Sequence, residues 1–226
     1  MDVPVIAIDG PSASGKGTVA EKVARELGFR YLDSGALYRL VTLAALQAKT
    51  DFGDEAALSR IAGSMDIDFR QGRTWLAGGD VTAALRAEEV GAAASRVAAH
   101  PAVRKALLAR QRGFRTSPGL VADGRDMGSV VFPDAPLKVF LTADVEARAE
   151  RRYKQLMEKG MYAKMTDVVE DLRRRDERDS TRPVAPLKHY PDAVFLDTTG
   201  VSADAAVQMI LDWWRERQQN PRVSGA

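Results

Sequence analysis

The sequence feature that most constrains the fold is a nine-residue loop near the start of the chain. An apolar run, residues 3–8, leads into Gly-Pro-Ser-Ala-Ser-Gly-Lys-Gly-Thr and then into a helical pattern that starts near Lys16. The glycines let the backbone turn tightly, so that its N–H groups point inward and the next helix directs its positive end at the same place. Lys16 adds a charge suited to the terminal phosphates of a nucleoside triphosphate. The order of strand, loop, Gly-Lys and helix predicts a nucleotide phosphate-binding loop formed by Gly10, Pro11, Ser12, Ala13, Ser14, Gly15, Lys16, Gly17 and Thr18.

The loop departs from the commonest phosphate-loop pattern at Gly17. Many such loops have Ser or Thr directly after the lysine, where the hydroxyl binds magnesium. Here the first hydroxyl comes one place later, at Thr18. We therefore expect Mg²⁺ to be held mostly by phosphates and water, with no direct protein ligand required. Thr18 and Asp123 are the two side chains that remain candidates for a contact with the metal.

Apolar strands alternate with helical patterns along the rest of the chain. The alternation predicts an α/β fold of the P-loop NTPase type, with a five-stranded parallel sheet, helices on both faces and ligands at the carboxyl ends of the strands. The expected strands are 3–9, 29–33, 119–123, 137–142 and 193–197, and the expected helices are 15–27, 34–48, 54–63, 83–99, 101–112, 144–159, 167–179 and 203–218. Short apolar segments with glycine turns at about 65–85 predict a small β insertion.

The composition excludes several classes of protein. With 33 basic and 31 acidic residues the net charge is +2, which argues against binding nucleic acid through bulk charge. The chain has no cysteine, which excludes disulfides and thiolate metal sites, and its two histidines are far apart in sequence. No apolar run approaches the ~20 residues that span a bilayer, and we see no signal peptide. We expect a cytoplasmic protein whose partners are small-molecule nucleotides, with no nucleic acid and no membrane among them.

Polar residues follow two of the predicted strands at the ligand edge of the sheet. Ser34 and Arg39 lie in the first turns of a helix after the second strand, suited to a second anion, with a helix cap and a solvated arginine as the alternative. Asp123, Arg125 and Asp126 end or follow the third strand, beside glycines that allow close backbone approach. Asp123 is placed to orient the loop or the waters of Mg²⁺, and Arg125 to bind phosphate. A plain salt bridge between strand-end residues is the alternative.

Arginine is unusually frequent, at 24 of the 33 basic residues. Its guanidinium group binds phosphate in a planar, bidentate way. Two helices after the fourth strand carry polar residues at helical spacing, with Arg148, Arg151 and Arg152 on the first and Arg175, Asp179 and Arg182 on and after the second. Such mixed-charge helices are usually solvated faces. In this position, a mobile lobe would instead close its arginines over the phosphates.

Five segments together resemble the bacterial cytidylate kinases. They are Gly-Pro-Ser-x-x-Gly-Lys-Gly-Thr at 10–18, Leu-Asp-Ser-Gly-Ala-x-Tyr-Arg at 32–39, Ala-Asp-Gly-Arg-Asp-Met-Gly at 122–128, Val-Val-Phe-Pro-Asp-Ala-Pro at 130–136 and Arg-Asp-x-x-Arg-Pro-Val-Ala-Pro-Leu at 178–187. The resemblance covers nearly the whole chain. The phosphate loop occurs in many kinase families, whereas the third and the fifth segments are specific to this one.

The resemblance implies that the chain converts CMP or dCMP into the diphosphate with ATP as donor and Mg²⁺ present. At matching positions, it implies that the phosphate of the monophosphate is bound by Ser34, Arg39 and Arg125. The sugar would contact Tyr38, Arg175 and Asp179. The transferring group would be faced by Lys16, Arg125, Arg182 and the lid arginines Arg148 and Arg152. The cytosine edge would be read by Ser95, Arg104 and Asp126.

The assignment of Asp126 to cytosine also makes chemical sense by itself. A carboxylate accepts from the exocyclic amino group of cytosine, and an arginine can serve the neighbouring ring acceptors. Uracil presents an acceptor where cytosine presents that amino donor, so a buried carboxylate would face a lone pair. We therefore expect CMP to be preferred over UMP.

The resemblance further implies one domain over residues 1–226 that acts as a monomer. Its core is 1–33, 113–147 and 183–226, its monophosphate-binding lobe is 34–112 with the β insert at about 65–85, and its lid is about 148–166. We expect direct in-line transfer, because the acceptor phosphate is already an anionic nucleophile. The alternatives are another small-molecule kinase on the same scaffold and, less favoured, a nucleotide switch of the GTPase type, whose two guanine-nucleotide motifs appear here only as fragments in reverse order.

Overall fold

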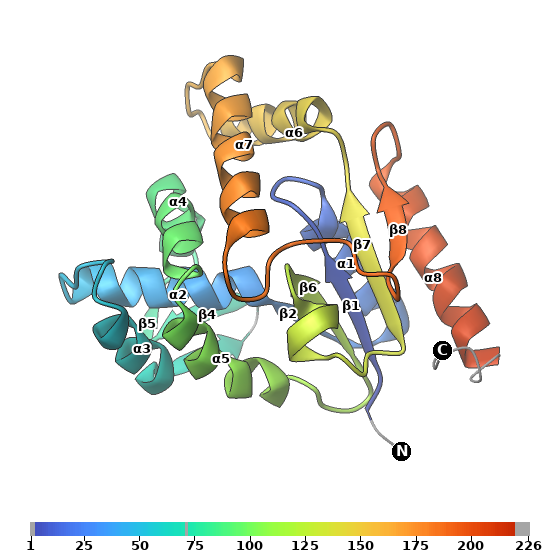
Figure 1. Cartoon of the computed structure of the whole chain (residues 1–226), viewed down its shortest axis with the longest axis horizontal. Helices are drawn as coiled ribbons and strands as arrows, with labels where there is room; N and C mark the ends of the chain where they lie inside the picture. Colours follow the sequence, from blue (N-terminus) through green and yellow to red (C-terminus); the bar gives the residue numbers. More distant parts are fainter. Residues whose placement is uncertain (1–2, 71, 220–226) are drawn as a thin grey trace. The chain divides into compact units, whose positions relative to one another are not determined.

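The computed structural model describes residues 3–70 and 72–219 of the 226-residue chain. They belong to two units (Figure 1): the first runs to Leu32 and resumes at Phe114, and the second is Asp33–Gly113. None of the helices in these described ranges is long and apolar enough to cross a bilayer.

The described residues of the first unit build a five-stranded parallel sheet, as the alternating sequence pattern predicts. Its strands lie in the order β2 (Arg30–Asp33), β6 (Leu120–Gly124), β1 (Val5–Asp9), β7 (Leu137–Thr142) and β8 (Val194–Asp197). β1 is central, since Ile8 pairs with Asp123 of β6 on one side and with Val139 of β7 on the other. The residues that follow β1 therefore emerge from the middle of the sheet, beside those that follow β6 and β7.

Two helices bury their apolar faces against this sheet. They are α1 (Lys16–Leu27) and α8 (Ala203–Gln219), which lie next to each other beside the strands in Figure 1. Val23 of α1 and Ile210 of α8 are fully buried in the same core cluster as Ile6 of β1. Trp214, at 5% exposure, packs its ring edge-on against Phe29 and belongs to the same core. The five-stranded sheet and these two helices fix where the loop between β1 and α1 stands.

A second pair of helices, α6 (Val145–Glu158) and α7 (Met165–Thr181), follows β7. Asp144 begins α6 as its N-cap, because its carboxylate accepts the Ala147 N–H at 2.6 Å. The two helices pack on each other through a small apolar cluster that includes Leu156 and Leu172. The predicted helix over 144–159 is confirmed, and α7 starts two residues before the predicted 167.

A single π-helical turn, η2 (Met127–Val131), was not predicted from the sequence. Two residues lie between it and the end of β6, and it packs against β1 and β6. Its first two N–H groups, those of Met127 and Gly128, both donate to the carboxylate of Asp9 at 2.8 Å. The turn is thus fastened to the end of β1, a contact between residues more than 100 positions apart in sequence that no local pattern signals.

The second unit is a helical layer with a small antiparallel sheet. Its elements are α2 (Ser34–Gln47), α3 (Glu55–Ser64), β3 (Ile67–Arg70), β4 (Arg73–Leu76), β5 (Gly79–Asp80), η1 (Ala84–Arg86), α4 (Glu88–Val97) and α5 (Pro101–Gly113). Within the unit, α2 packs on α4 and α3 packs on α5. The antiparallel strands β3, β4 and β5 lie within the stretch at about 65–85 where short strands joined by tight turns were predicted.

The prediction of one continuous helix over 83–99 is wrong. Residues 84–86 form a short 3₁₀ turn, Ala87 is extended at φ −66° and ψ 140°, and α4 starts only at Glu88. Two glutamates, Glu88 and Glu89, occupy the first turn of α4, where negative charge is favoured by the helix dipole. The two glutamates thus indicate a helix start at Glu88. The apolar periodicity nevertheless continues across this point, so the sequence pattern alone did not show that the helix is interrupted.

Candidate active site

The loop between β1 and α1 has the backbone of a phosphate-binding loop. Gly15 has φ +91° and Ala13 has φ +59°, and α1 begins directly afterwards at Lys16. Positive φ values let successive N–H groups turn toward one point, which the N-terminus of α1 also faces. Gly10 lies so close to β7 that a Cβ atom there would be 1.9 Å from the carbonyl oxygen of Leu141. The loop therefore requires glycine at position 15 because of the positive φ, and at position 10 because β7 leaves no room for a side chain.

Lys16 folds back over the loop. Its side chain is 10% exposed, and Nζ donates to the Pro11 carbonyl at 3.1 Å and lies 3.9 Å from Asp123 Oδ1. Asp123, at the end of β6, also accepts a hydrogen bond of 3.3 Å from the Tyr31 hydroxyl. The ammonium group is therefore held at the mouth of the loop by a carbonyl and a carboxylate, in a position from which it can turn to a phosphate.

Two arginines of α6 fasten the outer side of the loop. Arg148 donates to the carbonyls of Ala143 at 2.9 Å and Ser12 at 3.3 Å, and it pairs with Asp176 of α7 at 2.7 Å. Arg151 donates to the Ser14 carbonyl at 2.8 Å. These bonds fix the orientation of the Ser12 and Ser14 carbonyls within the loop.

Arg151 also reaches the segment after β8. It donates to the Thr198 carbonyl at 2.6 Å, and the Thr198 hydroxyl lies within hydrogen-bond distance of the carbonyls of Thr142 at 2.9 Å and Ser14 at 3.3 Å. Sequence reasoning placed Arg151 in the arginine-rich helix but gave it no role of its own. Its spacing from Arg148 was the only available signal, since its partners are main-chain atoms of distant segments.

Arg125 links the loop to α7. Its guanidinium donates to Ser12 Oγ at 2.9 Å, to Asp179 Oδ2 at 2.9 Å and to the Gly124 carbonyl at 3.1 Å. Burial acts to lower the pKa of this arginine, but the carboxylates led by Asp179 raise it above its ordinary value. Arg125 does form a salt bridge, but its partner Asp179 belongs to α7 and not to the strand end, and the same guanidinium also touches the phosphate-binding loop.

Asp126 and Arg182 form a second buried pair next to this one. Arg182 Nη2 lies 3.8 Å from Asp126 Oδ1, and both side chains are 4% exposed. Arg182 also donates to the Ala185 carbonyl at 2.6 Å, and the Asp179 carbonyl accepts from Leu187 N–H at 2.7 Å. The segment after α7 is thereby tied to its end, so that Arg125, Asp126, Asp179 and Arg182 are gathered within one unit.

Asp9 is the titratable group of this region that sequence reasoning missed. Burial raises the pKa of its carboxyl to about 7, against the two N–H donors of Gly128 and Met127 that lower it, and the nearby carboxylates of Asp126 and Asp123 raise it further. The sequence showed Asp9 only as the last residue of a strand. Its two donors are backbone groups, which explains why no side-chain motif pointed to it.

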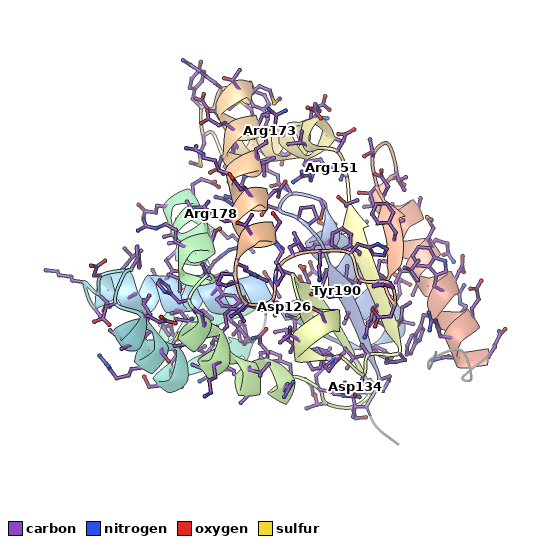
Figure 2. The ribbon with its side chains drawn as sticks, in the orientation of Figure 1. Asp126, Asp134, Arg151, Arg173, Arg178 and Tyr190 are labelled. Carbon is purple, nitrogen blue, oxygen red and sulfur yellow. The ribbon has the colours of Figure 1, made fainter. Side chains whose placement is uncertain are left out.

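Arg152, predicted for the lid, and Arg175, predicted for the sugar, contact residues of their own helices. Arg152 donates to Gln155 Oε1 at 3.3 Å, and Arg175 pairs with Asp171 at 2.9 Å one turn earlier on α7. Figure 2 shows labelled arginines of α6 and α7, Arg151, Arg173 and Arg178, distributed along the two helices. The Arg173 side chain is 65% exposed, as is usual on the solvated face of a mixed-charge helix.

The second unit holds the other residues predicted for the acceptor. Asp33 caps α2 by accepting the Ala36 N–H at 3.1 Å, so the cap is Asp33 and the buried Ser34 side chain is not used for it. Tyr38 and Arg39 follow on α2, and the guanidinium of Arg104 from α5 lies 5.7 Å from the Tyr38 ring centre.

Ser95 is the member of the predicted cytosine-reading set that α4 carries. Its Oγ is buried and has no hydrogen-bond partner within the described part of the chain. A buried hydroxyl without a partner is costly unless a ligand or a water satisfies it. The side chain is therefore consistent with a polar ligand.

The protein side chains alone offer few ligands to a metal ion. Across residues 3–70 and 72–219 there is no group of three or more His, Cys, Asp or Glu side chains arranged to hold one. Asp123 is buried next to Lys16, while Thr18 is exposed on α1. A hard cation could thus be accommodated with phosphate and water oxygens as most of its ligands.

Comparison with known proteins gives consistent results. Residues 6–216 match the family model described as cytidylate kinase. A cytidylate kinase of Chromobacterium violaceum is 57% identical over 96% of this chain and 98% of its own length. A cytidylate kinase of Paraburkholderia phymatum is 59% identical over 94% and 93% of the two chains. Among solved structures, a gluconokinase of Sinorhizobium meliloti has a TM-score of 0.52 at 14% identity, covering 100% of this chain and 98% of its own, which shows a shared fold alone.

Proposed function

The chain belongs to the cytidylate kinase family, and we propose that the site described above carries out that family's reaction by direct in-line transfer. The chain is an ATP-dependent nucleoside monophosphate kinase that phosphorylates CMP and dCMP to the diphosphates. The roles of individual residues, the use of Mg²⁺ and the order of events are our proposals. They are supported by the contacts of each unit taken separately.

The donor end of the reaction is assigned to the loop between β1 and α1. Its inward N–H groups and the start of α1 would bind the phosphates of ATP, and Lys16 would turn from the Pro11 carbonyl to the terminal phosphates. Mg²⁺ would supply charge neutralisation between the phosphates, held mainly by phosphate and water oxygens, with Thr18 or Asp123 as the candidate protein contacts. Arg148 would act here through the loop, since it is bonded to the Ser12 carbonyl.

The acceptor end is assigned to the residues that match the motifs of the family. The phosphate of CMP would be bound by Ser34, Arg39 and Arg125. The sugar would contact Tyr38, Arg175 and Asp179. The cytosine edge would be read by Ser95, Arg104 and Asp126. The buried Ser95 hydroxyl without a partner and the buried Asp126 carboxylate support the last assignment in particular.

The transfer itself needs positioning and charge stabilisation more than a strong base. The acceptor phosphate attacks as an anion, so no side chain has to remove a proton from it. Lys16, Arg125 and Arg182, with Arg148 and Arg152 of the lid, would stabilise the charge that develops on the transferring group. Closure of the lid would exclude water, which otherwise competes as acceptor.

The observation that carries this proposal is the position of Arg125. It lies 2.9 Å from the hydroxyl of Ser12 in the donor loop while the carboxylate of Asp179 holds its other side. An arginine so placed can bind an acceptor phosphate next to a donor phosphate, as in-line transfer requires. We further propose that the enzyme acts as a monomer in the cytoplasm, binds neither nucleic acid nor membrane, and forms one domain with a core, a monophosphate-binding lobe and a lid.

A coupled assay of ADP release tests the proposal. Purified protein with ATP and Mg²⁺ should turn over CMP and dCMP readily, and UMP about 100-fold less well by kcat/KM. AMP and shikimate should give background rates. The Arg125→Met variant, which keeps an unbranched apolar stem but removes the guanidinium group and its charge, should lose most of its activity with CMP. Preferred turnover of AMP, or nucleotide binding with no transfer to any monophosphate, would refute the proposal.

A further inference from the structure

The N–H groups at the start of the turn η2 are capped by a residue that is far away in the sequence. The first residues of a helical turn have N–H groups without partners inside the turn, and a side chain of the preceding residue usually accepts from them. Asp126 stands at that preceding position, with φ −148° and ψ 25°, yet its side chain makes no capping bond. Asp9 takes its place. Oδ1 of Asp9 accepts from Met127 N–H and Oδ2 accepts from Gly128 N–H, each at 2.8 Å.

This exchange changes what the Asp126 carboxylate can do. A capping aspartate turns its oxygens back onto its own turn, whereas Asp126 has an oxygen 3.8 Å from Arg182 Nη2. Only the backbone of Asp126 is committed to η2, where its carbonyl accepts from Val130 N–H at 2.9 Å. The backbone directly after Asp126 is fixed by Asp9, while the Asp126 carboxylate points toward Arg182.

The position of Asp9 in the sequence gives this cap a second consequence. Asp9 directly precedes Gly10, the first residue of the donor loop, and its two bonds hold the residues that directly follow Asp126. The stem of the Lys138 side chain packs closely on Gly128, since a Cβ atom on Gly128 would be 3.1 Å from it. The backbone of η2 therefore has little room to shift. The loop that carries Arg125 and Asp126 is therefore held in register with the end of β1.

The environment of Asp9 makes the arrangement costly. Burial raises the pKa of its carboxyl to about 7, so the charged form that accepts both bonds is disfavoured by its surroundings. The residue also borders a small cavity that Ser129 and Tyr190 line. An apolar residue at the end of β1 would extend the sheet without this cost, but it would leave two N–H groups of η2 without acceptors.

We propose that Asp9 is a positioning residue for acceptor recognition, which sets the backbone of η2 so that the Asp126 carboxylate meets the amino group of cytosine. The inference rests on the proposed function, in which Asp126 reads that amino group. It predicts an effect on the acceptor and little effect on the donor, because the donor loop is held separately by Arg148 and Arg151. Asp9 itself does not touch the substrate in this scheme.

The test compares Asp9→Asn with Asp192→Asn at pH 8, where the Asp9 carboxylate of the wild type is mostly ionised. The amide keeps one acceptor and turns an N–H donor toward the second backbone N–H. Asp192 borders the same cavity but does not bond to η2, so it receives the same chemical change as a control. Steady-state kinetics are measured with CMP and UMP as acceptors and with ATP varied separately.

We expect Asp9→Asn to raise KM for CMP and to lower the CMP-to-UMP ratio of kcat/KM by about 10-fold each, as the loss of one charge-assisted hydrogen bond implies. KM for ATP should stay within about 2-fold, and Asp192→Asn should match the wild type in all three quantities. Partial unfolding lowers kcat but changes neither KM nor the ratio, so this readout separates positioning from a loss of folded enzyme. Asp9→Ala, which deletes both acceptors, should show the same changes.

Two results would overturn the inference. One is an unchanged KM for CMP and an unchanged ratio in both Asp9 variants. The other is failure of both to fold while Asp192→Asn folds, since the bonds would then serve the fold alone. If the proposed function itself is wrong, the result is different, because the wild-type protein will then not prefer CMP over UMP.

Discussion

Gly10→Ala is the change whose cost can be worked out most directly from the structure. Gly10 leaves the central strand β1 at the point where β7 passes, and a Cβ atom there would be 1.9 Å from the Leu141 carbonyl oxygen. Real Cβ atoms essentially never come closer than 3.0 Å to such an atom, so the two backbones must separate by about 1 Å. Both atoms belong to backbone in the middle of a sheet, and no side-chain rotation can relieve the contact.

The magnitude follows from what the separation breaks. The last pair of the β1–β7 ladder, Asp9 with Phe140, lies next to the clash and would lose its hydrogen bonding at about 1 kcal/mol per bond. Forcing an extra carbon into a packed region costs about 1–3 kcal/mol more. We therefore expect Gly10→Ala to lower the free energy of unfolding by about 2–5 kcal/mol, and to weaken ATP binding because the donor loop starts at the same residue.

Thermal and urea unfolding, followed by circular dichroism, measure the loss of stability, and titration with ATP measures the loss of binding. Gly63→Ala is the matched control, since Gly63 is exposed in α3 and a Cβ there has no atom within 4 Å. It should raise stability by about 0.5–1 kcal/mol, because alanine is the better helix former. Equal effects of the two substitutions, or a Gly10→Ala protein as stable as the wild type, would show that the close approach to Leu141 does not decide the residue at this place.

Three further outcomes are expected. Lys16→Ala should lower kcat by about 10³-fold with little loss of stability, measured by ADP release and thermal unfolding; near-normal activity would show the donor site to be elsewhere. Since the pKa of Asp9 is raised from 3.8 to about 7, the folded protein retains a proton that the unfolded chain loses between these values. Relative to Asp9→Asn, the wild type should lose up to about 4 kcal/mol of stability as pH rises from about 4 to 7, and urea unfolding that shows no such trend would contradict the shift. Asp144→Ala removes the bond to Ala147 N–H at the start of α6 and should cost about 1 kcal/mol in urea unfolding, against no change for the exposed Arg173→Ala.

Most of the fold could be predicted because its signals are local. The apolar strand before Gly10, the helical spacing after Lys16 and the stop at Gly28 describe β1, the donor loop and α1 with an error of one or two residues. The same holds for α6, where Asp144 marks the start by its type and position. Each of these decisions depends on residues no more than four positions apart.

The site was predictable only as a set of residue types at the ends of strands. Arg125 and Asp126 were recognised as candidates because charged groups are out of place next to a buried strand, and Asp179 because of its helical spacing with Arg175 and Arg182. The structure gathers them in one unit. Their roles toward a substrate remain predictions. The contacts of Asp9 and Arg151 were not predictable, since both bind main-chain atoms that any residue type supplies.

The bonds of Arg148 and Arg151 to the donor loop also limit where the proposed lid can bend. The first two turns of α6 are anchored to loop carbonyls, so this part of the helix and the donor loop must travel as one body. We expect the pivot to lie farther along, near Gly160, whose φ of +70° already marks a break between α6 and α7. In that case the first two turns of α6 form a fixed part of the proposed ATP site, and only the segment near Gly160 moves when the site closes.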